Sequence, residues 1–243
     1  MQIVCFDELD STNSYLKREY PSYKDMTVVV ASHQSEGKGR LGRKWEDDSS
    51  SLLFSILLKN SLDMEHASLL SLLSGVCLHE TLLDYSIPSE IKWPNDVLLQ
   101  GKKCAGILLE SVVRDKPEAL IVGIGVNLNN VRFPDEIKDK AVSLFLASGR
   151  KFDRMEFLKA FLGHFVERYS RFRKKDFSFL EVLKNHSYLD GKEILLDYYG
   201  ENLKCRVVSV LDDGRLEVID RNGKLHDVDS GEASLCRNYS NSF

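Results

Sequence analysis

The sequence predicts an α+β protein in which helices pack on a mixed β-sheet, followed by a small β-barrel. Over residues 1–188, strand-like runs rich in Val, Ile and Phe are interrupted by helical patterns at irregular intervals, without a clean strand–helix alternation. Over residues 189–243, four short strand-like runs are separated by turn sequences such as DDG and RNG. We therefore expect two domains that meet between residues 188 and 189.

Charge supports the same division. The chain has 243 residues and a net charge of −4, and the imbalance lies in residues 189–243, which carry seven basic and eleven acidic side chains. This near-neutral balance excludes a histone-like polycation. The sequence has no run of 18 apolar residues that would span a membrane and no secretory signal. The five cysteines are scattered, so we expect free thiols and a cytoplasmic location.

The elements of the first half follow from local patterns. Ser11 or Thr12 can cap a helix that Pro21 ends. Leucines at helical spacing mark a long helix, and apolar runs rich in β-branched residues mark the strands. In chain order we expect strand, helix, strand, strand and helix at residues 2–9, 11–20, 27–33, 51–58 and 64–85.

The second half continues with three successive strands, of which the first two are joined by a turn at Gln100 and Gly101, and then with two closing helices. The strands are expected at residues 90–99, 102–113 and 119–128, and the helices at 152–175 and 177–186. The barrel strands are expected at residues 192–199, 203–211, 215–220 and 224–229.

A glycine-rich basic loop, residues 34–45 (QSEGKGRLGRKW), is the first candidate site. It holds three glycines, which permit close backbone approach to a ligand, and four cations, which attract phosphate. Trp45 at its end could cover a flat ring. The loop lacks the Gly-Lys-Ser/Thr ending of a Walker A motif, and no helix follows it as in a dinucleotide fingerprint. A solvated basic loop is the alternative.

Three further segments could carry chemistry. The carboxylate in KWPND (92–96) could hold magnesium or accept a proton from an amine, although an Asn-Asp turn is the commoner meaning of that pair. In KKCAGILLE (102–110), a lysine precedes small residues that leave room for a ligand, with a surface lysine as the alternative. In GIGVN (123–127), a strand ends with two glycines and an amide, which an apolar strand could also tolerate.

Together with STN (11–13) and GEASL (231–235), these segments resemble the biotin–protein ligases, or holocarboxylase synthetases, in order and spacing across nearly the whole chain. The resemblance implies a catalytic domain followed by an SH3-like barrel. Many members carry an N-terminal winged-helix DNA-binding domain. Here the pattern begins within ten residues of Met1, so the resemblance is to the single-function type, with no nucleic-acid partner.

The resemblance implies ATP-dependent ligation of biotin to a lysine of a biotin carboxyl carrier protein through biotinyl-adenylate. ATP and Mg²⁺ are expected as co-substrate and activator, with no tightly bound prosthetic group. The partner is an apo carrier domain, no membrane is involved, and a homodimer is left open. Three rivals remain: a non-catalytic biotin-responsive regulator, a lipoate ligase or octanoyl transferase of the same fold, and a nucleotide-binding module without transfer.

The resemblance also implies roles for individual residues. Lys103 would bridge the biotin carboxyl and the phosphate, Arg40 would hold the adenylate, and Asp96 would orient or deprotonate the incoming lysine, with metal contact as its competing role. No metal ligand is firmly assigned, and Mg²⁺ is expected near Asp96 and Asn127. Biotin-binding residues would be Ser11, Thr12, Asn13, Gln34, Gly37, Arg40, Lys103, Gly106, Leu108, Gly123 and Val126. ATP-binding residues would be Lys38, Arg40, Arg43, Trp45, Asn95, Asn127 and Arg237.

Some positions depart from the family pattern. Lys38 stands where arginine is frequent, and it keeps the charge but not the bidentate fork. Leu41 replaces a second arginine and makes the loop less basic. After GEASL the family often has arginine, whereas here Cys236 comes first and Arg237 second.

Overall fold

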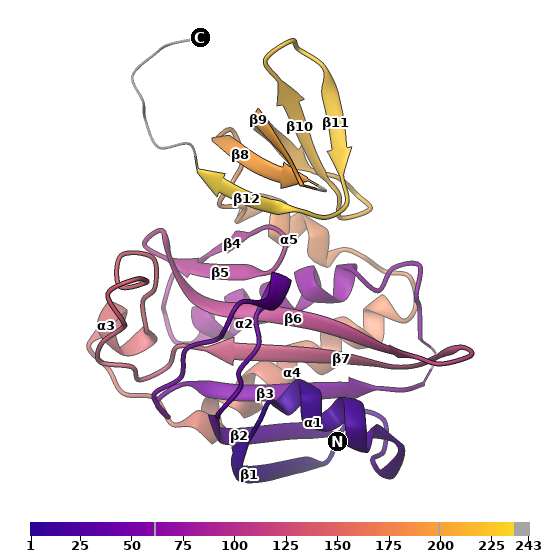
Figure 1. The fold of residues 1–243 in the computed structure, drawn as a ribbon, viewed down its shortest axis with the longest axis vertical. Coiled ribbons are helices and arrows are strands. Elements are labelled where there is room, and N and C mark those ends of the chain that lie inside the picture. Colours follow the sequence, from indigo (N-terminus) through magenta and orange to yellow (C-terminus); the bar gives the residue numbers. More distant parts are fainter. Residues whose placement is uncertain (61, 199, 236–243) are drawn as a thin grey trace.

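The computed structural model describes residues 1–60, 62–198 and 200–235 and contains two β-sheets (Figure 1). The larger sheet has seven strands in the order β1-β2-β3-β7-β6-β5-β4, with β1 and β2 parallel and the other neighbours antiparallel, so the predicted mixed sheet is confirmed. Its strands are β1 (Ile3–Leu9), β2 (Val28–Gln34), β3 (Leu52–Leu58), β4 (Glu90–Lys92), β5 (Asp96–Leu99), β6 (Lys102–Val113) and β7 (Pro117–Val126).

Helices cover both faces of this sheet unequally. Figure 1 shows α2 (Leu69–Asp84) and α4 (Arg154–Phe172) behind the sheet and α1 (Thr12–Glu19) in front of it. Because consecutive strand residues point to opposite faces, Phe54 of β3 packs toward α4, with its ring 5.3 Å from that of Phe161. The next residue, Ser55, contacts the start of α1. The face that carries α1 is therefore the less covered one.

The helices begin and end close to their sequence signals, with two differences. Ser11 caps α1 by accepting from the Ser14 N–H, and a short 3₁₀ turn at Tyr20–Ser22 follows the helix. The long helix α2 begins at Leu69 and not at residue 64, because residues 65–68 form a turn in which Asp63 accepts from the His66 N–H. Helix α5 (Phe179–Asn185) was predicted. Helix α3 (Leu144–Ser148) was not predicted, because five residues are too few to show a periodic pattern.

The prediction of one strand over residues 90–99 is wrong. Strands β4 and β5 form an antiparallel hairpin whose last pair is Lys92 and Asp96. The chain reverses through Trp93, Pro94 and Asn95, because proline has no N–H to donate to a strand ladder. Pro94 and the Asn95-Asp96 pair are the sequence signals of this reversal, since these residues favour turns.

The C-terminal sheet is antiparallel with the order β11-β10-β9-β8-β12 and lies beside the β4–β5 end of the larger sheet (Figure 1). Its strands are β8 (Glu193–Tyr198), β9 (Glu201–Val210), β10 (Leu216–Asp220), β11 (Leu225–Val228) and β12 (Glu232–Leu235). The four predicted strands are present, and β12, which was not predicted, pairs with β8. The proposed boundary at residues 188 and 189 stays a prediction.

The second sheet packs tightly on the first unit. The indole N–H of Trp93 donates to the carbonyl of Gly214 at 3.0 Å, and a Cβ on Gly214 would overlap Leu69 of α2. Buried side chains of both sheets belong to one continuous hydrophobic cluster. Within the described part of the chain, no helix has the length and apolar character needed to cross a membrane.

Candidate functional site

Two adjoining cavities lie on the α1 face of the larger sheet. The sheet cavity, of about 460 Å³, is bounded by the start of α1, the basic loop and strands β6 and β7. The loop cavity, of about 630 Å³, lies between the basic loop, the β4–β5 turn and the start of β12. Residues that line both cavities are Gly39, Arg40, Trp45, Asn95 and Lys103.

The floor of the sheet cavity is bare backbone. Gly106 of β6 pairs directly with Gly125 of β7, and Gly123 lies two residues before Gly125 on the same face. A Cβ on Gly125 would lie 2.7 Å from Cε2 of Trp45, and a Cβ on Gly123 would overlap the Asn13 carboxamide. The glycines therefore let Trp45 and Asn13 lie directly on the sheet. Gly125 was not among the predicted site residues.

Polar groups gather at the α1 end of the sheet cavity. Gln34 Oε1 accepts from the Thr12 N–H at 2.7 Å and lies 3.0 Å from Thr12 Oγ1. Ser55 Oγ lies 2.7 Å from Thr12 Oγ1 and 2.6 Å from Asn13 Oδ1. Thr12, Asn13, Gln34 and Ser55 are all buried. Ser55 was missed by the sequence analysis, although it is the one polar residue in the otherwise apolar run LLFSILL.

Trp45 separates the two cavities. Its ring faces the glycine floor, and the Lys103 ammonium lies 5.5 Å from the ring centroid. Its buried Nε1 has no hydrogen-bond partner among the residues that the structure describes. A Cβ on Gly37 would lie 2.9 Å from the Trp45 carbonyl oxygen, so Gly37 shapes the loop although it does not line the sheet cavity.

Cations of the site are held by polar partners. Lys103 Nζ pairs with Asp96 Oδ1 at 2.6 Å, and Arg40 Nη1 donates to Asn95 Oδ1 at 3.1 Å. Lys38 Nζ donates to Ser14 Oγ at 2.9 Å at the edge of the sheet cavity. These groups leave a concentrated positive charge between the two cavities, where an anion would be attracted.

Three more cations, Arg43, Lys44 and Lys92, line the loop cavity. Arg43 forms an ion pair with Glu232, the first residue of β12, so the basic loop contacts the C-terminal sheet directly. That hydrogen bond raises the pKa of Arg43. Burial lowers the pKa of Lys92, and Asp96 opposes the effect. Glu232 belongs to the GEASL segment but was not among the predicted site residues, since its strand was not predicted.

A β-bulge directs Lys103 into the site. The pairing of β5 with β6 shifts from Val97–Ala105 to Leu98–Lys103, so Cys104 is an extra residue. Cys104 is fully buried, and its Sγ lies 3.3 Å from the Val97 carbonyl oxygen. The extra residue reverses the alternation of side chains, so Lys103 and Gly106 both line the cavities.

Some predicted residues lie elsewhere. Val126 packs in the hydrophobic core and does not line either cavity. Asn127 also lies outside them, because its Nδ2 donates to the Lys103 and Val142 carbonyl oxygens, both at 3.3 Å. Arg237 and Cys236 lie outside the described residues.

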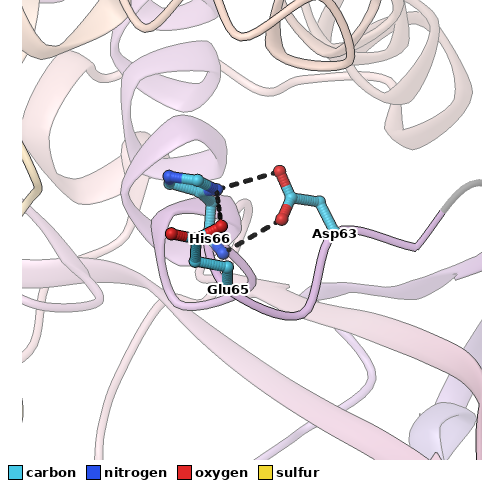
Figure 2. Close-up of side chains that lie close together, drawn as sticks. All are labelled: Asp63, Glu65 and His66. Atoms are coloured by element: carbon cyan, nitrogen blue, oxygen red, sulfur yellow. Dashed lines mark hydrogen bonds and ion pairs between the residues drawn. The ribbon is translucent and has the colours of Figure 1, made fainter.

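A separate cluster of titratable groups precedes α2. Figure 2 shows the side chains of Asp63, Glu65 and His66 close together. The Lys175 ammonium, from the turn that follows α4, lies 2.5 Å from Asp63 Oδ2 and 3.1 Å from His66 Nδ1. A protein cation already contacts these ligand atoms, so we interpret the cluster as a link between the turn before α2 and α4.

The fold and the site define an α+β protein whose cation-lined double cavity suits an anionic ligand with an apolar body. The model of the Biotin/lipoate A/B protein ligase family matches residues 5–127, about half of the chain. The chain belongs to this family.

Individual relatives agree with this assignment. The bifunctional ligase/repressor BirA of Bacillus subtilis is 34% identical over 204 residues, which cover 82% of this chain and 60% of that protein. The biotin--[acetyl-CoA-carboxylase] ligase of Mycobacterium tuberculosis is 28% identical over 240 residues, which cover 95% of this chain and 88% of that protein. The solved biotin protein ligase from Aquifex aeolicus in complex with biotin and ATP superposes with a TM-score of 0.86 and 33% identity, covering 98% of this chain and 99% of that one.

Proposed function

We propose that this chain is a biotin–protein ligase that activates biotin with ATP and transfers it to a carrier lysine. In the first step a biotin carboxylate oxygen bonds to the α-phosphorus of ATP, and the bond from that phosphorus to the bridging oxygen breaks, releasing pyrophosphate. In the second step the carrier amine bonds to the biotinyl carbon, AMP leaves with the electron pair of the acyl–oxygen bond, and the amine loses a proton.

The observation that carries this proposal is the position of Lys103 where the two cavities meet. The sheet cavity combines a glycine floor and apolar lining residues such as Leu53 and Trp45 with a polar end, which suits the bicyclic ring and ureido group of biotin. The loop cavity, with Arg40, Arg43 and Trp45, suits the phosphates and base of ATP. Lys103 would then neutralise the two anions that must approach each other, and stabilise the charge that develops in transfer.

Asp96 is our candidate for the second step. A free lysine is almost wholly protonated near pH 7, so the carrier amine must lose a proton before it attacks. Asp96 lines the loop cavity and contacts Lys103 Nζ. Once an anionic adenylate engages Lys103, the Asp96 carboxylate would be available to orient or deprotonate the incoming amine. The loop closed over the anhydride would keep water away from it.

The residues also fit a magnesium ion that enters with the nucleotide. Mg²⁺ is commonly held by one or two carboxylates together with substrate phosphates. The carboxylate of Asp96, whose buried Oδ1 now pairs with Lys103, would face the ion from the β4–β5 turn once an anionic ligand engages Lys103. The amide oxygen of Asn95 already accepts from Arg40. When bound, the ion would neutralise phosphate charge. Asn127, outside both cavities, would act on this region only through the Lys103 backbone.

The remaining assignments follow from the proposed reaction. The partner would be the apo biotin carboxyl carrier domain of a carboxylase, and the enzyme would act in the cytoplasm. A lipoate ligase or octanoyl transferase is the second candidate, because the matched family includes lipoate ligases. The polar end of the sheet cavity favours biotin, since a dithiolane or an alkyl chain offers no N–H for its acceptors.

The test is incubation with MgATP, an apo carrier domain and either biotin or lipoate. We expect mass spectrometry to find one biotinylated carrier lysine and no lipoylated one. Lys103→Ala should lower the rate of biotin-dependent pyrophosphate exchange by far more than tenfold. A tenfold loss corresponds to about 1.4 kcal/mol of activation free energy. Lys102→Ala is the matched control, because the neighbouring Lys102 lines neither cavity and its Nζ donates to the Lys138 carbonyl oxygen at 3.4 Å. No biotinylated lysine, with an established ligase active on the same carrier, would overturn the proposal.

A further inference from the structure

Lys92, the last residue of β4, is a cation that the reaction proposed above does not use. It is partly buried, and it lines the loop cavity but not the sheet cavity. Its ammonium has no hydrogen-bond or ion-pair partner among the residues that the structure describes. Every other cation that lines the loop cavity has one, namely Arg40 with Asn95, Arg43 with Glu232, Lys44 with Glu46, and Lys103 with Asp96.

The β4–β5 hairpin offers Lys92 a partner that another residue has taken. Lys92 lies directly opposite Asp96 in the ladder, and side chains of opposite charge at paired positions ordinarily attract each other. Asp96 Oδ1 instead lies 2.6 Å from Lys103 Nζ of β6. The Asp96 carboxylate is therefore engaged from β6, and the Lys92 ammonium is left for an anion that enters the cavity.

The charges around Lys92 favour such an anion. Burial lowers the pKa of Lys92, an effect that Asp96 opposes and Lys103 reinforces. Of the described residues that line the loop cavity, five are cations and only Asp96 and Glu232 are carboxylates. An ammonium that is partly removed from water without a partner costs free energy, which a bound anion recovers. The cavity is therefore suited to a ligand group with several negative charges.

The position of Lys92 relative to Lys103 matches the geometry of a displacement at phosphorus. The attacking and leaving oxygens of such a reaction lie roughly in line on opposite sides of the phosphorus. Lys103 lies where the two cavities meet, and biotin would attack from the sheet cavity. The leaving oxygens would then lie on the opposite side, in the loop cavity, which is the cavity that Lys92 lines.

We propose that Lys92 is a catalytic residue of the first step that binds the terminal phosphates of ATP and the pyrophosphate that leaves. This inference rests on the proposed function. As the bond from the α-phosphorus to the bridging oxygen breaks, its electron pair stays on that oxygen. The N–H groups of Lys92 stabilise this added negative charge, and no proton is transferred. Pyrophosphate takes no part in the second step, so Lys92 has no role in the attack of the carrier amine.

The test compares Lys92→Met, which removes the charge and keeps the length of the side chain, with Lys102→Met. In biotin-dependent pyrophosphate exchange we expect Lys92→Met to raise the KM for pyrophosphate and for ATP tenfold to roughly a hundredfold, the effect of one lost hydrogen bond to a charged group. The KM for biotin and the inhibition constant of AMP, which has no terminal phosphates, should be unchanged. Lys102 lines neither cavity, so Lys102→Met should leave all four constants unchanged.

The second half-reaction provides the contrast. With chemically prepared biotinyl-adenylate and an apo carrier domain, Lys92→Met should transfer biotin at the wild-type rate, which also shows that the variant is folded. Lys92→Gln carries the test if Lys92→Met does not fold. An unchanged KM for pyrophosphate, or an equal loss in exchange and in transfer from the adenylate, would overturn the inference while the proposed function stands. A wild-type chain without biotin-dependent exchange would overturn both.

Discussion

Replacing Gly125 by alanine would test how the basic loop packs on the sheet. The new Cβ would lie 2.7 Å from Cε2 and 2.8 Å from Cζ2 of Trp45. That is about 1 Å inside ordinary van der Waals contact. Strand β7 is central and buried, whereas Trp45 is partly exposed and belongs to a loop, so the indole should move. We expect the free energy of unfolding to fall by no more than about 1 kcal/mol, the low end for overpacking.

Ligand binding should suffer more than stability. Trp45 lines both cavities, so its displacement removes a wall from each. We expect the Kd for ATP to rise about tenfold, equivalent to about 1.4 kcal/mol. Urea unfolding measures the stability, and titration calorimetry measures the Kd. Gly163→Ala is the control: nothing lies within 4 Å of its Cβ in helix α4, so it should stabilise by about 0.5–1 kcal/mol.

Trp45→Ala decides the cause. If the indole is what the new methyl group meets, adding Gly125→Ala to Trp45→Ala should cost nothing further in stability. An equal cost of Gly125→Ala with and without the indole would show that the strain lies in the sheet itself. Contact between the new methyl group and Trp45 would then not be the cause of the lost stability.

Two other substitutions probe the interior. The pKa of His79 is lowered to about 4, first by burial and then by His186, whose ring centroid lies 4.1 Å from that of His79. The folded state therefore favours the neutral ring. The stability that this confers is complete above pH 6.5 and is lost as the pH falls through 4, by up to roughly 3 kcal/mol. Urea unfolding between pH 7 and pH 4 should show this loss in the free energy of unfolding, and His79→Asn should make that free energy depend less on pH. The same pH dependence in the wild type and in His79→Asn would contradict the prediction. Trp93→Phe removes the donor to the buried Gly214 carbonyl and should lower the free energy of unfolding by about 1–3 kcal/mol in urea at pH 7. No change would mean that water replaces the indole N–H.

Local patterns predicted the parts of the site that each segment carries by itself. The i, i+2 spacing of Gly123 and Gly125 puts them on one face of any strand, and the cations of the basic loop are visible without a fold. Their meeting with Gly106 depends on the register of the β6–β7 hairpin, which no pattern in either strand specifies. The contact between Asn13 and Glu110 joins residues 97 positions apart.

The elements that were not predicted correctly also depend on contacts between distant segments or are too short to show a pattern. The reversal at Trp93 has local turn signals, Pro94 and the Asn95-Asp96 pair, but the strands on either side have only three and four residues and are too short to show a pattern of their own. The short β12 has no strong strand pattern of its own, and it forms because β8 offers an edge to pair with. Glu232 therefore reaches Arg43 through tertiary pairing, which is information that the local sequence does not contain.

Of the adjacent residues Lys102 and Lys103, only Lys103 lines the cavities, and the reason lies in the packing of the hydrophobic core. Strict alternation would place Lys103 on the face opposite Gly106, away from the cavities. The bulge reverses this order, and it persists because Cys104 is fully buried. A thiol is small enough to be enclosed there and apolar enough to need no charged partner. The position of the central cation is thus determined by the packing of the residue that follows it, which explains why two adjacent lysines of equal charge have different surroundings.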